Sequence, residues 1–126
     1  MEDLGILIIR LVLGLTFVGH GSQKLFGWFG GHGIKGTGGW MESVGIKPGV
    51  LMAVVAGVLE FVGGLLYATG FWFTLGAAMI VLAMLGAMKV HLPNGYWADK
   101  GGIEYPFVII AIAIGLALIG PGIYSL

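Results

Sequence analysis

Two ionisable side chains lie within long apolar segments, Arg10 in the first and Glu60 in the second. Each charge near the centre of a bilayer costs about 2.5–3.5 kcal/mol on insertion scales, so pairing is the cheapest remedy. Counted from the predicted outer ends, Arg10 and Glu60 differ in depth by only about 4–5 Å at a rise of 1.5 Å per residue. The sequence therefore predicts an Arg10–Glu60 pair. Its role is either a structural contact that sets helix register or a polar site for a small anion, a quinone oxygen or a proton.

Further polar side chains lie where apolar segments end on one side of the predicted membrane. They are expected to converge beneath a glycine-rich loop, although a single His at such a boundary is more often an interfacial residue than a ligand. Glu60 is the candidate proton relay, and His91 joins the set from its position alone. The predicted ligand-binding set comprises Arg10, His20, Lys24, Glu60, His91, Glu104 and Tyr105.

Two other kinds of site are not predicted. No two His residues stand three or four positions apart, so the sequence does not indicate a metal site. Residues 31–36 match the pattern G-x-G-x-x-G, but no strand precedes them and no crossover unit is available. We therefore do not interpret them as a dinucleotide-binding motif.

The composition indicates an integral membrane protein. The chain is 58% hydrophobic and 10% charged, with a mean hydropathy of +1.02, whereas soluble domains carry roughly 25% charged residues. Four continuous apolar segments approach the length of about 20 residues that a helix needs to cross the hydrocarbon core, which favours helices over barrel strands. We predict one all-α domain over residues 1–126, a bundle of four transmembrane helices at about 4–21, 48–69, 72–90 and 105–124.

The placement of charge predicts an orientation. Six basic and six acidic residues leave no net charge, so there is no electrostatic argument for nucleic acid. Five of the six basic residues lie in or beside the loops after the first and third segments. The positive-inside rule places those loops in the cytoplasm and both termini outside a plasma membrane. The first segment lacks a basic start and a cleavage site, so we expect it to be retained as a helix.

Glycine and aromatic residues dominate the first long loop, residues 22–47, which predicts a cap at the headgroup level. Within it we expect a short helix that is capped by Thr37 and ends at Gly45. Small residues spaced by four predict close contacts between helices. These sets are Ala53/Gly57, Glu60/Gly64/Ala68, Ala83/Ala87/His91 and Ala111/Gly115.

The chain also resembles a known family. Besides Arg10, the resemblance is carried by three short stretches: GHGSQKLFG at 19–27, EFVGGLL at 60–66 with Gly70 after it, and GIEY at 102–105. Together they resemble the DoxX family, small bacterial and archaeal membrane proteins of four spans. The resemblance implies a plasma-membrane protein tied to redox metabolism, since relatives include the small, DoxD-type subunit of a thiosulfate:quinone oxidoreductase. It does not imply catalysis by the isolated chain.

The leading hypothesis is a membrane subunit that binds a quinone or a related small polar molecule in the bundle and works with a soluble or membrane redox partner. The chain has no cysteine, so it cannot itself perform thiol–disulfide chemistry. Alternatives are a transporter of small metabolites that acts as a homo-oligomer, and a membrane anchor for a soluble enzyme. The sequence does not identify the ligand, and membrane lipid is the one certain partner of an apolar bundle.

Overall fold

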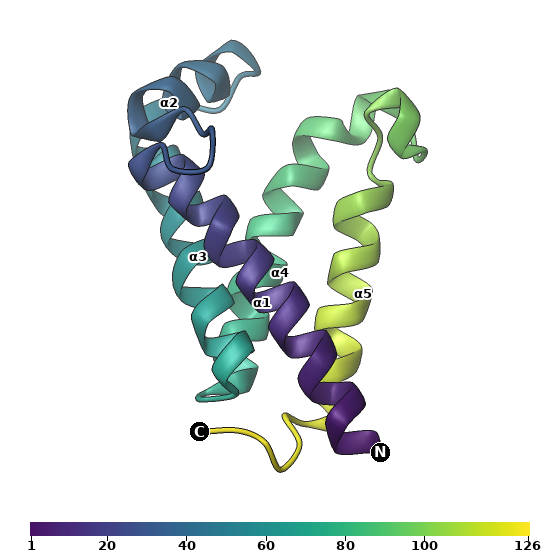
Figure 1. Ribbon diagram of the computed structural model, residues 1–126. Helices are drawn as coiled ribbons and strands as arrows, with labels where there is room; N and C mark the ends of the chain where they lie inside the picture. The colour runs from purple at the N-terminus through teal and green to yellow at the C-terminus, as the bar shows by residue number, and fades with distance from the viewer.

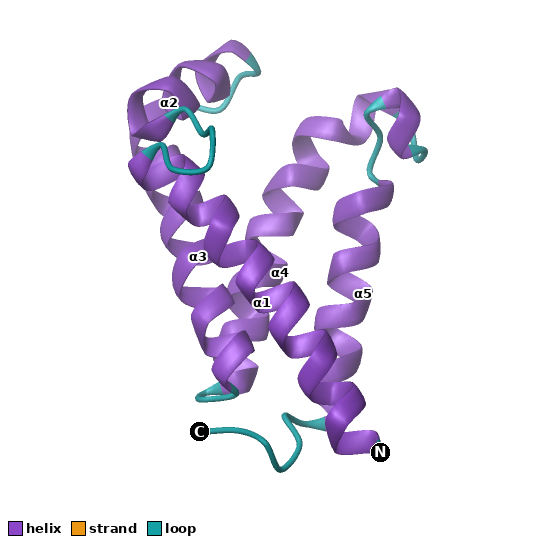
Figure 2. Cartoon of the chain, viewed as in Figure 1, coloured by secondary structure: helices purple, strands orange, loops and turns teal.

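Five α-helices and two short 3₁₀ helices form the chain, and the computed structural model describes all residues 1–126. Figure 1 shows their arrangement, and Figure 2 shows that the elements are helices joined by loops, with no strand. In chain order they are α1 (Glu2–Phe26), α2 (Gly33–Ser43), α3 (Gly49–Thr69), α4 (Phe73–His91), η1 (Leu92–Asn94), η2 (Ala98–Lys100) and α5 (Glu104–Ile119).

The apolar helices confirm the all-α membrane fold. Three stretches are long and apolar enough to cross a bilayer: Glu2–Phe26, Gly49–Thr69 and Phe73–Asn94. The helix Glu104–Ile119 is also apolar but shorter. The protein is therefore a multi-pass membrane protein.

Residues at the helix ends favour the observed start and end points. Glu2 and Asp3 lie in the first turn of α1, where acidic side chains interact favourably with the helix dipole. The left-handed residues Gly27 and Gly70, with φ of 74° and 80°, end α1 and α3. Pro48 directly precedes α3 and therefore does not interrupt its hydrogen bonds.

Three of the predicted boundaries were wrong. The first segment was expected to end at residue 21, but α1 continues to Phe26 and ends at the left-handed Gly27. The fourth segment was expected to continue to residue 124, but α5 ends at Ile119 because Gly120 adopts φ of 108° and Pro121 has no N–H group to continue the helix. The short helix was expected to start at Thr37, but α2 begins at Gly33 and buries Thr37 within it. Its end, one residue before Val44, agrees with the expected stop near Gly45.

The bundle has two arms. Helix α3 packs extensively along α1, α4 packs against α3 and α5, and the α1–α3 and α4–α5 pairs diverge toward the end that carries α2 and the 3₁₀ helices (Figure 1). Both termini lie at the opposite end of the bundle (Figure 1). The two long loops therefore share one end of the molecule, which agrees with the predicted up-and-down topology.

The contact between α1 and α3 depends on glycine. A Cβ atom at Gly14 would lie 2.6 Å from the carbonyl oxygen of Gly64, and one at Gly21 would lie 2.7 Å from that of Gly57. Only hydrogen fits at these positions, so the two backbones approach closely, as is typical where small residues replace the hydrophobic effect in driving helix contacts in lipid.

The small-residue prediction was correct for α3 but wrong for α5. Gly57, Gly64 and Ala68 all face α1, whereas Gly115 has no neighbour near its Cβ position and is exposed, as is Ala111. Helix α5 instead buries the face that contains Pro106, Ile109, Ala113 and Leu116. This face repeats at intervals of three to four residues, as a helical contact surface must.

Substitution of Gly14 tests the glycine contact. Gly14→Ala places a methyl group against the α3 backbone and should lower the free energy of unfolding by about 1–3 kcal/mol, the usual range for overpacking. Gly19→Ala is the matched control, because Gly19 lies in the same helix with nothing within 4 Å of its Cβ position. It should be neutral or slightly stabilising. Unfolding in mixed micelles measures both, and equal effects would contradict the close-contact interpretation.

Candidate functional site

An ion pair links α1 and α3 within one arm of the bundle. Lys24 lies in the last turn of α1, and Glu60 lies in the middle of α3. The Nζ group of Lys24 donates a hydrogen bond to Oε1 of Glu60. The Glu60 side chain is 3% exposed and that of Lys24 is 27% exposed. The carboxylate is thus buried, while the ammonium group remains partly accessible.

The predicted Arg10–Glu60 pair does not form, because the register of α1 on α3 separates the two residues. Gly14 lies against Gly64, so Arg10, one turn earlier in α1, reaches the end of α3. Its guanidinium carbon lies 3.3 Å from the position that a Cβ atom added to Gly70 would occupy. Glu60 is ten residues before Gly70, which is about 15 Å along a helix. The prediction assumed that the outer ends of the first two membrane segments lie at the same depth. In the structure the first turns of α1 extend past the end of α3, so Arg10 and Glu60 lie at different depths.

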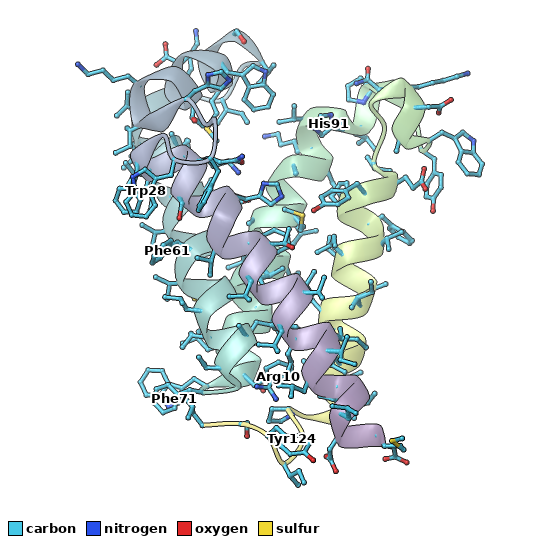
Figure 3. All side chains as sticks on the ribbon, viewed as in Figure 1. Arg10, Trp28, Phe61, Phe71, His91 and Tyr124 are labelled. Atoms are coloured by element: carbon cyan, nitrogen blue, oxygen red, sulfur yellow. The ribbon has the colours of Figure 1, made fainter.

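Arg10 is satisfied by backbone carbonyl groups instead. Its Nη1 donates to the oxygens of Pro121 and Tyr124, each at 2.8 Å, and its Nη2 donates to Ala68 at 2.8 Å. Its Nε donates to Tyr67 at 3.4 Å. These bonds use four of the five N–H donors of a guanidinium group, and Arg10 is 1% exposed. Figure 3 shows Arg10 and Tyr124 close together at the end that carries both termini.

The Arg10 cluster holds the segment after α5 against the rest of the bundle. The amide of Leu126 donates to the carbonyl of Thr69 at 3.0 Å, and the amide of Ile123 donates to Oδ1 of Asp3 at 3.2 Å. Carbonyls at the end of α3 carry the negative end of the helix dipole, which favours a cation there. Arg10 therefore links α1, α3 and residues 120–126.

Loss of Arg10 should destabilise the fold. Arg10→Leu leaves the buried carbonyls without donors and should lower the free energy of unfolding by about 3 kcal/mol or more. Lys89→Leu, which removes an exposed cation from α4, should change it by less than about 1 kcal/mol. Deleting residues 121–126 removes the same bonds, so its effect should add less than fully to that of Arg10→Leu. Unfolding in mixed micelles is the measurement, and full additivity would contradict the link.

Five of the seven predicted site residues line one cavity. It lies between α1, α4, α5 and the loop around η2, and its volume is about 320 Å³, which is within the range of small-molecule sites. The residues that contribute polar side chains are His20, Lys24, Glu60, His91 and Tyr105. Phe17, Met84 and Ala87 are among the residues that form its apolar walls.

The other two predicted residues lie elsewhere. Arg10 lines a separate hollow of about 490 Å³ together with residues 123–126. Glu104 accepts a hydrogen bond from the amide of Ala98 at 2.9 Å through its Oε1. Glu104 thus holds the loop around η2, which forms one wall of the polar cavity.

Sequence reasoning missed the role of Gln23. Its Oε1 lies 3.3 Å from Nδ1 of His20, and its Nε2 donates to the carbonyl of Phe29 at 3.2 Å. Gln23 therefore connects a ring that lines the cavity to the loop before α2. The sequence did contain an indication of this contact: Gln23 is three residues after His20, which places both side chains on one face of α1.

Free hydrogen-bonding groups remain at the ion pair. Within the chain, Glu60 accepts its hydrogen bond through Oε1, and Lys24 donates one of its three N–H groups. Oε2 of Glu60 and two N–H groups of Lys24 are left without a partner inside the protein. The pair can therefore accept from and donate to a ligand without breaking. No group of three His, Asp or Glu side chains is arranged to hold a metal ion.

Comparison with known proteins identifies the family. The family model described as DoxX matches residues 5–92. The chain belongs to the DoxX family. The matched residues include Arg10, Lys24, Glu60 and His91. Helix α5 and the loop around η2 lie outside the match.

One curated relative has a name that refers to chemistry. The chain is 27% identical over 119 residues to a protein of Bacillus subtilis (strain 168) named "Putative oxidoreductase CatD". The alignment covers 94% of this chain and 81% of that protein. No solved structure matches the chain.

Proposed function

We propose that this DoxX protein is a membrane subunit linked to redox metabolism, which binds a quinone or a related small polar molecule and acts with a partner oxidoreductase. The observation that carries the proposal is the pair of the buried Glu60 carboxylate and the partly exposed Lys24, whose free donors and acceptor adjoin a cavity of about 320 Å³. The family assignment and the name of the Bacillus subtilis relative support the link to redox metabolism.

The two members of the ion pair have defined tasks in this proposal. Lys24 donates to a carbonyl oxygen of the ligand, and Oε2 of Glu60 accepts from a ligand hydroxyl group. A carboxylate in this position also serves as a proton relay, which is one of the roles that ionisable side chains have inside membrane bundles. Electrons come from the partner oxidoreductase that the proposal includes; the chain has no cysteine and therefore no thiol chemistry of its own. The chain contributes binding, orientation and protons.

The ion pair gives the first test of the proposal. Glu60→Gln removes the acceptor charge, and loss of a hydrogen bond to a charged group, about 1.5–3 kcal/mol, corresponds to roughly tenfold or greater loss of affinity. Binding of decylubiquinone to the protein in lipid nanodiscs measures this. Glu2→Gln, an exposed change at the start of α1, should leave the affinity unaltered.

A second variant separates binding from folding. If Glu60→Gln alone unfolds the bundle because Lys24 loses its partner, the double variant Lys24→Gln, Glu60→Gln removes both charges and leaves a pair of amides that can bond each other. The proposal is wrong if this folded double variant, or Glu60→Gln itself, binds the quinone as tightly as the unmodified protein. Flux of small metabolites through vesicles without quinone binding would instead support the transporter alternative.

We further propose that the protein lies in the plasma membrane with its two long loops in the cytoplasm. The basic residues near those loops support this orientation. Because the chain has no cysteine, single cysteines at the exposed positions Glu2 and Asp99 report on opposite ends. A membrane-impermeant maleimide should label Glu2→Cys in intact cells and Asp99→Cys only after permeabilisation. The reverse pattern would invert the orientation.

A further inference from the structure

A second cavity lies on the other side of the ion pair, between α2, α3 and α4. Its volume is about 380 Å³, and most of its lining is hydrophobic. Met52, Val55 and Leu59 line it from α3, Leu82 from α4 and Met41 from α2. The ionisable side chains in its wall are Lys24, Glu60 and His91. We call it the apolar cavity.

The apolar cavity exists because α3 and α4 separate toward their α2 end. Near the termini the two helices touch closely, since a Cβ at Gly63 would lie 2.9 Å from Met79 and one at Gly76 would lie 2.8 Å from Leu66. Further along α4, a Cβ at Gly86 would meet no atom within 4 Å. Figure 1 shows the same divergence of the two arms. The opening thus reflects helix geometry and is not a local packing defect.

The two cavities meet at the ion pair. Lys24, Glu60, Met84, Ala87 and His91 line both of them. In Figure 3, His91 lies at the α2 end of α4, beside the space between the arms. A single ligand can therefore contact the pair with a polar head while an attached apolar group continues between α2, α3 and α4.

We propose that the apolar cavity is a subsite for the hydrocarbon chain of a membrane amphiphile whose polar head binds the Lys24–Glu60 pair. This inference rests on the proposed function and narrows its ligand to molecules that carry such a chain. An apolar chain needs no hydrogen bonds, so it enters this cavity without leaving polar groups unpaired. The flexible thioethers of Met41, Met52 and Met84 adapt to chains of different shape.

Filling the apolar cavity tests the subsite. Gly86→Phe introduces a ring into open space on the cavity wall. Gly115→Phe is the matched control, because Gly115 is also an exposed helical glycine with no atom within 4 Å of the position a Cβ atom would occupy. Unlike Gly86, Gly115 lines none of the three cavities. The probes are decylubiquinone and ubiquinone-0, which share a head group and differ in the chain. Each probe is compared between variants in lipid nanodiscs of one composition, after circular dichroism has verified helical content.

The expected result is selective loss. Gly86→Phe should weaken binding of decylubiquinone at least tenfold and change binding of ubiquinone-0 by less than twofold, while Gly115→Phe should change neither. Equal effects on both probes, or no effect on decylubiquinone, would overturn the subsite and leave the proposed function standing. If the unmodified protein binds neither probe, the proposed function fails and the subsite fails with it.

Discussion

The close contact between α1 and α3 is the constraint on which the rest of the structure depends. Gly14 and Gly21 lie so near the backbone of α3 that a Cβ atom at either position would clash with it, and these contacts define the register of the two helices. That register places Lys24 opposite Glu60 and moves Arg10 to the end of α3. The positions of Arg10 and Lys24 therefore follow from contacts made by glycines, which have no functional side chain themselves.

The two cations are accommodated in different ways at the two ends of the bundle. Arg10 uses four N–H donors on backbone carbonyls and is almost fully buried. Lys24 uses one donor on Glu60 and remains partly exposed beside two cavities. A guanidinium group suits the first task because its planar donors can bond several carbonyls at once, whereas an ammonium group suits an exchangeable contact.

The divergence of the arms explains why the polar groups stay accessible in so small a protein. Tight α3–α4 packing at Gly63 and Gly76 closes one end of the molecule, and the core beside it contains fully buried rings such as Phe17 and Tyr67. Toward α2 the helices separate, and cavities form on both sides of the ion pair. The bundle is therefore closely packed at the end that carries the termini and open at the end that carries α2.

The sequence by itself determined the class of the fold and much of the site. Continuous apolar segments set the helices, because lipid requires every backbone group to bond within its own segment, and polar residues at the segment ends indicated which side chains meet. Only the tertiary structure decided the pairing. Helix register depends on contacts across many residues, so Glu60 pairs with Lys24 and not with Arg10. The partners of Arg10 are backbone carbonyls, which every residue carries and no sequence pattern distinguishes.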